Sequence, residues 1–256
     1  MIASCLLIIL FPIFGANTFA DTKTIRVGIY DNPPKLFLDE KKQPKGIFPG
    51  LLNAIAEKEG WRLKFIPVTF KQGLKQIEEG TLDIMQDVAW SEKRSQIFDF
   101  NQETVMVSWG RVYQRKGMMI NTLIDLKGKR IACMDGGIYS QGPDGLVTLI
   151  NKFEIDAAFI PMSGYQQVLE AVSQGNADAG VVNRLYGKLN KSKYEIENTP
   201  ILISPISIRL AFSRHNPGTP ELIRIIDAHL RRMKKDDDSV YYQLIDQYIR
   251  SPKTSI

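Results

Sequence analysis

Cysteine and histidine are scarce in this 256-residue chain, which contains two of each. Cys5 lies in an apolar N-terminal segment, so the remainder of the chain has one thiol, Cys133, which can form neither an internal disulfide nor a metal cluster. With only His215 and His229, a histidine-based metal site is not expected. We therefore expect no metal and no cofactor, and we interpret Cys133, in the apolar run RIACM, as a small buried hydrophobic residue.

Arginine-rich runs, zinc-finger spacings and a G-x-S-x-G motif are also missing. The formal net charge is +5, but lysines and arginines are interleaved with acidic residues, so nucleic acid is not an expected partner. A mild basic excess is compatible with attraction of anionic ligands. The missing G-x-S-x-G motif argues against a serine hydrolase.

The first twenty residues, MIASCLLIILFPIFGANTFA, contain no charged side chain. An apolar core at 6–14 is followed by TFA, a small-residue cleavage pattern, although the usual N-terminal lysine or arginine is missing. We interpret residues 1–20 as a secretory signal peptide and expect the mature protein in the periplasm. Beyond this segment no apolar run reaches the length of a membrane span, so we expect the mature chain to be soluble.

Residues 24–88 alternate between strand-like and helix-like patterns, which predicts a parallel sheet with right-handed crossovers. The expected strands are 24–30, 61–68 and 84–88, and the expected helices are 48–60 and 70–80. The alternation repeats later, with strands at 130–134, 157–162 and 178–183 and helices at 146–153 and 164–175. Gly80 and Asp83 have the same spacing as Gly175 and Asp178, which suggests two similar lobes.

The end of the chain follows a different pattern. Residues 199–217 are apolar and extended, and we expect Pro205 to interrupt them. Two helices are expected at 220–233 and 239–249. The charge run KKDDD between them is typical of a solvated turn.

A ligand position is suggested where the run GTLDIMQDVAWSEKR leaves its strand. In open α/β sheets ligands bind beyond the carboxyl ends of the strands, which here are followed by Ala89, Trp90, Ser91 and Arg94. The planar guanidinium of arginine fits a carboxylate with two parallel hydrogen bonds. The alternative is an ordinary strand and a surface loop whose arginine forms a salt bridge.

The order of these segments resembles the family 3 extracellular solute-binding proteins, the polar-amino-acid type of periplasmic binding protein. The resemblance covers nearly all of the mature chain and rests on an ordered set of segments rather than on one motif. The segments are GIFPGLLNAIAEKEGWRLKFIPVTFKQGLKQIEEGTLDI, SEKRSQIFDF, LIDLKGKRIACMDGG, GNADAGVVN and DDDSVYYQLIDQYI. PPKLF and VVNRLYG also resemble periplasmic input domains of sensor kinases and cyclases.

The resemblance implies an α/β, two-lobe fold of the type II periplasmic-binding-protein class, with a cleft between lobes joined by two crossing strands. The crossings are expected near 110–113 and 204–208. Lobe 1 would combine residues 22–111 with 207–256, and lobe 2 would be the inserted residues 112–206. Such lobes close on ligand like a hinged clamp.

Binding residues carry over from the family at three positions. Arg94 matches the arginine that pairs with the ligand carboxylate, Phe70 matches an aromatic residue that packs on the ligand, and Gly136 matches the glycine before a helix whose amides face the anion. Tyr30, Asn32, Trp90 and Tyr139 are further candidates for the cleft wall. Turn formation at DNPP and surface positions for the aromatic residues are the alternatives.

Several positions depart from the family pattern. Ala89 replaces a ligand-binding hydroxyl, Asp87 replaces a small residue, and Asn183 replaces the aspartate that takes an α-ammonium group. Gly137 and Ile138 replace serine or threonine, and Pro143 and Gly145 would delay or break the following helix. Asp87 could restore selection for an ammonium group, neutralise Arg94, or point away and pair with a lysine.

These residues predict a protein that binds a small carboxylate-bearing ligand, either an amino acid or a related organic acid. We expect a monomer that serves ABC-type import, with an inner-membrane permease as a partner. The alternatives are a sensing domain of a receptor, which a chain ending at SPKTSI without a second membrane segment disfavours, and an enzyme resembling cyclohexadienyl dehydratase. An enzyme would need a positioned acid or base, and Asp87 near Arg94 is the one pair available.

Overall fold

The computed structural model describes residues 23–250. The predicted signal peptide lies outside the described residues. The first half contains β1 (Thr24–Ile29), β2 (Phe37–Leu38), β3 (Pro44–Lys45), α1 (Ile47–Glu59), β4 (Arg62–Pro67), α2 (Phe70–Glu78), β5 (Ile84–Ala89), α3 (Glu92–Ser95), β6 (Asp99–Phe100) and β7 (Met106–Arg115). The second contains β8 (Arg130–Met134), α4 (Ile138–Gln141), α5 (Leu146–Lys152), β9 (Ala158–Met162), α6 (Tyr165–Ser173), β10 (Ala179–Asn183), α7 (Arg184–Asn190), β11 (Ile196–Phe212), α8 (Thr219–Met233) and α9 (Val240–Ile245).

The predicted helices of the first half begin and end for local reasons. Thr69 and Gln72 form a capping box at the start of α2, in which each side chain accepts a hydrogen bond from the other residue's backbone N–H. Helix α1 ends at Gly60, whose φ of 67° lies in the left-handed region that glycine adopts without strain. The α/β alternation predicted for 24–88 is therefore confirmed.

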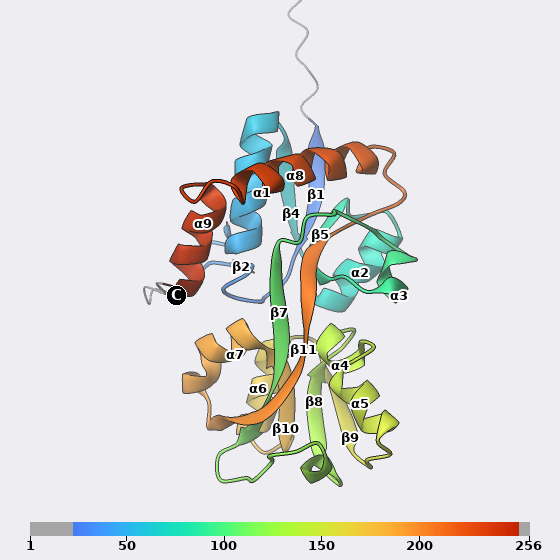
Figure 1. The fold of residues 1–256 in the computed structure, drawn as a ribbon, viewed down its shortest axis with the longest axis vertical. Helices are drawn as coiled ribbons and strands as arrows, with labels where there is room; N and C mark the ends of the chain where they lie inside the picture. Colours follow the sequence, from blue (N-terminus) through green and yellow to red (C-terminus); the bar gives the residue numbers. More distant parts are fainter. Residues whose placement is uncertain (1–22, 251–256) are drawn as a thin grey trace, which may run out of the picture.

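Two bodies share one nine-stranded sheet with the order β4-β1-β5-β11-β7-β10-β8-β9, and β6 pairs with β11 (Figure 1). In each body the first strand of the βαβ unit lies between the other two, all three parallel. We call the body of β1, β4 and β5 lobe 1 and the body of β8, β9 and β10 lobe 2. Helices α8 and α9 return to lobe 1, where α9 contacts α1.

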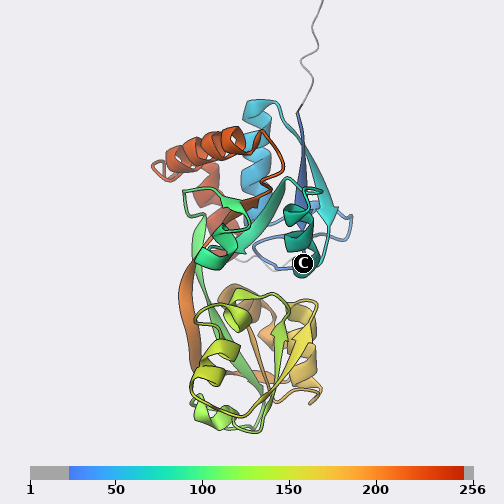
Figure 2. The same ribbon diagram turned by 90° about the vertical axis from the view of Figure 1, so that its right-hand side faces the viewer.

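The antiparallel strands β7 and β11 connect the two lobes, as both views show (Figures 1 and 2). Gly110 pairs with Ile203 and Ser108 with Ile206 where the strands pass between the lobes. β11 continues through Pro205 as one strand of 17 residues, so the predicted break there is wrong. The ladder between β11 and β7 shifts register between Ile203 and Ile206 instead, because proline has no N–H to donate.

The repeated G-x-x-D spacing has a structural explanation in lobe 1. The guanidinium of Arg26, on β1, donates to Asp83 Oδ1 at 2.7 Å and to the carbonyl of Gly80 at 2.8 Å. The backbone N–H of Arg26 donates to Asp83 Oδ2 at 2.7 Å. Gly80 has a φ of 76°, which turns the chain from α2 into β5. The motif therefore fastens the start of β5 to its parallel neighbour.

Lobe 2 contains the same arrangement. Arg130, on β8, donates to Asp178 Oδ1 at 3.0 Å and to the carbonyl of Gly175 at 2.7 Å, and its backbone N–H donates to Asp178 Oδ2 at 2.9 Å. The Asp83 side chain is 6% exposed, whereas that of Asp178 is 17% exposed. The similar spacing thus marks an equivalent strand junction in both lobes.

Replacing Asp83 with asparagine should lower the free energy of unfolding by about 1–2 kcal/mol, less than a fully buried charged contact because Arg26 is partly exposed. Burial raises the pKa of Asp83, but the hydrogen bonds and charge of Arg26 outweigh it and lower the pKa below 3.8. The stabilisation is therefore complete above pH 3.8 and lost as the pH falls through the lowered pKa. Urea unfolding at pH 7 and pH 3 measures this.

Asp178→Asn is the matched control and should cost less, because Asp178 is more exposed. Equal urea midpoints for Asp83→Asn and the wild type at pH 7 would contradict the assigned role of the motif.

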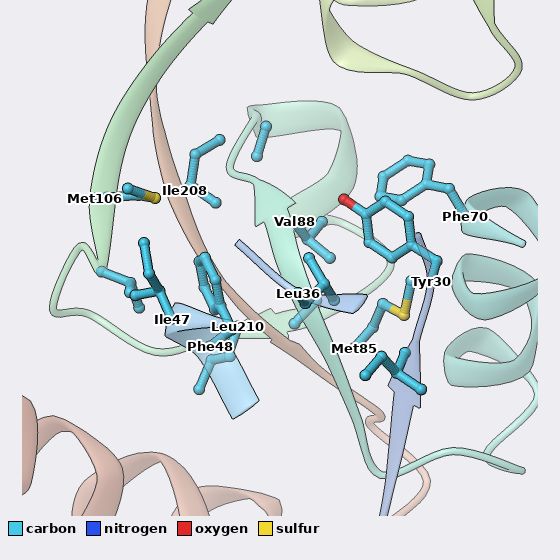
Figure 3. Close-up of a cluster of buried hydrophobic side chains, with 14 of the residues drawn as sticks. Tyr30, Leu36, Ile47, Phe48, Phe70, Met85, Val88, Met106, Ile208 and Leu210 are labelled. Atoms are coloured by element: carbon cyan, nitrogen blue, oxygen red, sulfur yellow. The ribbon is translucent and has the colours of Figure 1, made fainter. Parts of the chain in front are cut away.

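Apolar side chains from β1, β5, α1, α2 and β11 pack into the larger hydrophobic cluster (Figure 3). Tyr30 and Phe70 lie side by side in this cluster, with ring centroids 5.1 Å apart.

Cys133 is buried in the second cluster, as predicted, and burial raises the pKa of its thiol to about 11. None of the helices in the described part of the chain combines the length and apolarity of a membrane span.

Candidate functional site

A small cavity lies between the lobes, where β1, β5 and β8 end at their carboxyl edges. In this conformation its free volume is about 10 Å³, close to the room that one water molecule needs. The cavity is lined by Tyr30, Lys35, Phe70, Asp87, Ala89, Arg94, Met134, Ile138, Tyr139, Tyr165 and Ile208. Four aromatic rings, two cations and one carboxylate therefore surround the space, a composition suited to a small polar ligand.

Arg94 lies in α3, just after the carboxyl end of β5, the strand at which the sequence predicted a ligand site. Its backbone N–H donates to the hydroxyl of Ser91, the N-cap of α3, at 3.3 Å. Its guanidinium donates to the carbonyls of Ala89 at 2.9 Å and Gly136 at 2.8 Å. The guanidinium carbon lies 5.5 Å from the ring centroid of Phe70. Arg94 thus reaches from lobe 1 to lobe 2.

The charge of Arg94 is not balanced by a partner carboxylate within residues 23–250. Burial lowers the pKa of Arg94 to about 10, although Tyr30, Tyr165, Tyr139 and Asp87 act in the opposite direction. Arg94 is half-buried, and a cation partly removed from water without an opposite charge costs free energy. An anion placed beside Arg94 would recover that cost.

Asp87 forms a buried cluster with Tyr30, Asn32 and Lys35 in the cavity wall. Its Oδ2 accepts hydrogen bonds from the Tyr30 hydroxyl and from Asn32 Nδ2, both at 2.6 Å. Its Oδ1 forms an ion pair with Lys35 Nζ at 2.5 Å. Asp87 thus pairs with a lysine, but it does not point away from the cleft as that alternative held, because both residues line the cavity.

The backbone directs Asp87 toward this cluster. Asp87 has a φ of 54°, which non-glycine residues rarely adopt, although aspartate tolerates it better than most. Two β5 residues, Gln86 and Asp87, stand opposite one β11 residue, Leu210, so the strand has a bulge here. β-Bulges redirect side chains next to functional sites.

Three polar contacts join the lobes around the cavity. Besides the contact of Arg94 with Gly136, Asn183 Nδ2 donates to Asn32 Oδ1 at 2.8 Å, and Lys71 Nζ lies 2.8 Å from Asp135 Oδ2. Asn183 Oδ1 accepts from the N–H groups of Leu185 and Tyr186 and so caps α7. Asn183 is therefore a structural link between lobes as well as a helix cap.

The loop after β8 differs from what the resemblance implies. The carbonyl of Gly136 faces Arg94, while its N–H donates to the side chain of Gln141 at 3.1 Å. Gly137 is the N-cap of α4, a helix of only four residues that ends at Gly142. The predicted interruption around 143–145 is confirmed, since α5 starts at 146. The N–H groups of Gly136 and Gly137 are thus taken, by Gln141 and by the carbonyl of Met134, and are not free for an anion.

The other predicted site residues lie either in the cavity or in a groove next to it. Ala89, Phe70, Ile138, Tyr139 and Tyr30 line the cavity. Burial raises the pKa of Tyr139, whose buried hydroxyl has no hydrogen-bond partner within the described residues. Trp90 and Ser91 instead line an adjacent groove formed with Ile203–Ile206 of β11.

Sequence reasoning did not identify four of the lining residues, Lys35, Met134, Tyr165 and Ile208. Lys35 had a recognisable signal, a lone charge between DNPP and the apolar LF. Burial lowers the pKa of Lys35, whereas Asp87 raises it and the charge of Arg184 lowers it further.

In the part of the chain that the structure describes, no three histidine, cysteine or acidic residues are grouped to hold a metal ion.

The fold and the cavity define a two-lobe binding protein of the type II periplasmic class. Residues 25–251 match the model of the bacterial extracellular solute-binding proteins, family 3. The chain belongs to that family, whose members bind small molecules and are typically extracellular or periplasmic. A comparison with curated proteins found no match.

Solved structures share this fold at low sequence identity. A mutant of ArgBP from T. maritima is 21% identical, with a TM-score of 0.76 over 89% of this chain and 96% of that one. The substrate-binding protein of an amino acid ABC transporter is 20% identical, with a TM-score of 0.75 over 89% and 100%. A histidine kinase sensor domain similar to periplasmic binding proteins is 21% identical, with a TM-score of 0.75 over 89% and 96%.

Proposed function

We propose that this protein captures a small carboxylate-bearing ligand between its two lobes in the periplasm and delivers it to an ABC importer. The observation that carries the proposal is Arg94, a half-buried cation beside Phe70 at the lobe junction, with no carboxylate partner among the described residues. The ligand carboxylate would take the guanidinium donors now on backbone carbonyls. Membership in the solute-binding family supports this role.

The proposal includes closure of the lobes and their boundaries. Lobe 1 comprises 22–111 and 207–256 and lobe 2 comprises 112–206, with β7 and β11 as the hinge. The contacts Arg94–Gly136 and Asn32–Asn183 would hold the closed form. Export by a signal peptide over 1–20 and a monomeric mature protein complete the proposal.

Binding rather than catalysis is supported by the state of Asp87. Of the residues that line the cavity, Asp87 is the one acid, and Tyr30, Asn32 and Lys35 occupy both of its oxygens. A carboxylate held in this way is not placed to take a substrate proton. A sensing role is the second candidate, supported by the structural similarity to a kinase sensor domain.

A thermal-shift screen of small carboxylic acids, amino acids and amines tests the proposal. A ligand at 100 times its Kd should stabilise the fold by about 2.7 kcal/mol. For a chain of this size that corresponds to a Tm increase of about 5–10 °C. A shift caused only by amines, or by no compound with a carboxylate, would overturn the proposal.

Uptake of the identified ligand by cells separates import from sensing. Cells that lack this protein should accumulate less than about a tenth of the labelled ligand taken up by wild-type cells. Unchanged uptake would contradict the importer assignment and favour the sensing role.

Ligand affinity should fall at high pH because Arg94 must be charged. The pKa of Arg94 is lowered to about 10, so the guanidinium loses its proton as the pH rises through that value. A bound anion favours the charged form, so affinity is complete below pH 10 and falls by about tenfold per pH unit above it. Calorimetric titrations between pH 7 and 11, with circular dichroism to verify folding, measure this. A constant Kd to pH 11 would contradict it.

A further inference from the structure

A buried ion pair forms part of the wall of the cavity that Arg94 also lines. The side chains of Lys35 and Asp87 are 3% and 0% exposed, and both line the cavity. Lys35 comes from the loop after β1 and Asp87 from the bulge in β5, so both belong to lobe 1. Because this ion pair lies inside the cavity, it affects which charges a bound ligand can carry.

The Asp87 carboxylate already holds three donors, one of them the cation that balances its charge. Its Oδ2 holds Tyr30 and Asn32 at 2.6 Å each, and its Oδ1 holds Lys35 at 2.5 Å. A ligand ammonium group would either displace Lys35 from Asp87 or stand beside it, and in both cases two buried cations would share one anion. Two cations that share one anion in a cavity with little water repel each other strongly.

Lobe 2 offers no replacement for this anion. Asn183, which stands at the end of β10, is neutral, and its oxygen already caps α7 through Leu185 and Tyr186. Its amide nitrogen donates to Asn32. The described residues that line the cavity therefore carry two cations, Lys35 and Arg94, against the one anion Asp87.

We propose that the ligand of this cavity is a small organic acid without an ammonium group, because the Lys35 ammonium already occupies the cation position beside Asp87. The inference rests on the proposed binding function and narrows its ligand class to oxo, hydroxy or dicarboxylic acids. Lys35 is in this view the specificity-determining residue, and Arg94 is the residue that contacts the carboxylate. The chain would thus differ in ligand class from an amino-acid-binding protein.

Matched pairs of acids that differ in the amino group test the proposal on the wild-type protein. The probes are pyruvate with L-alanine, succinate with L-aspartate, and 2-oxoglutarate with L-glutamate, measured by calorimetry. We expect the member without the ammonium group to bind at least 100-fold more tightly in every pair that binds. An amino acid that binds as tightly as its partner, or more tightly, overturns the proposal while leaving the proposed solute-binding function intact.

Failure of the proposed function has a different signature. If no probe binds, and the broader screen of carboxylates produces no thermal shift, the proposal and the binding function both fail. If only amines bind, both fail as well. A preference measured on the wild-type protein does not depend on the folding of any variant.

Lys35→Met tests the role of the lysine directly. This variant frees Asp87 Oδ1, so the preference for the acid over the amino acid should fall by at least tenfold. Lys35→Arg keeps the charge and should keep the preference for the acid over the amino acid. It is the variant to measure if Lys35→Met does not fold. Lys64→Met, at an exposed position on β4, is the matched control and should leave the preference unchanged. An unchanged preference in a folded Lys35→Met protein overturns the assignment to Lys35.

Discussion

Lys35→Met should destabilise the folded protein by about 3–5 kcal/mol, because it leaves the Asp87 carboxylate buried without its charge partner. Tyr30 and Asn32 still donate to Asp87 and limit the loss. Removing one member of a buried ion pair costs more than the pair contributes in net stability, since the remaining charge stays desolvated. Denaturant unfolding at pH 7 measures the difference.

The double variant Lys35→Met with Asp87→Asn should recover most of this loss. Asparagine removes the charge, can accept a hydrogen bond from Tyr30, and tolerates the positive φ at position 87. We expect the double variant within about 1–2 kcal/mol of the wild type, since neutral replacements of a buried pair are often tolerated. A double variant no more stable than Lys35→Met would show that the two residues are not energetically coupled.

Arg94→Ala should weaken binding of the acid found in the screen by at least about 100-fold, or about 3 kcal/mol. The variant removes the charge and the two guanidinium donors now on the carbonyls of Ala89 and Gly136, and with them the contact that joins the lobes. Arg94→Lys keeps the charge but not the planar pair of donors, so its affinity should lie between wild type and Arg94→Ala. Calorimetry on all three proteins measures the series.

Arg62→Ala is the control for this series. Arg62 is an exposed arginine on β4, in the same lobe, and lies outside the set of residues that line the cavity. The Arg62→Ala variant should bind the acid with the affinity of the wild type. If Arg94→Ala bound the acid as tightly as Arg62→Ala does, Arg94 would not contact the ligand.

The sequence predicted the cavity residues next to β5 better than those that reach the cavity from a distant loop. Ala89 ends β5 and Arg94 follows it, and both line the cavity, as the rule that ligands bind at carboxyl ends of strands predicts. Lys35 was missed because it approaches Asp87 from a loop 52 residues earlier in the chain. A contact of that kind depends on how loops fold over the sheet and leaves no periodic signal.

Departures from the family pattern were visible in the sequence, but their consequences were not. Asn183 was recognised as a neutral replacement for an aspartate, yet its use as the cap of α7 and as a link to Asn32 required coordinates. Likewise, Asp87 was recognised as unusual, and only the bulge in β5 explains where its carboxylate points. Side-chain direction in an irregular strand depends on a local register shift that residue types do not encode.

The sequence by itself determined the α/β alternation, the two equivalent G-x-x-D junctions and the family. These are local or near-local features, because helix and strand periods are set by backbone geometry. Only the tertiary structure decided which charges neutralise each other inside the cavity. Lys35, Asp87 and Arg94 meet through the packing of loops from separate elements, and their partners are chosen by distance and burial in the folded protein.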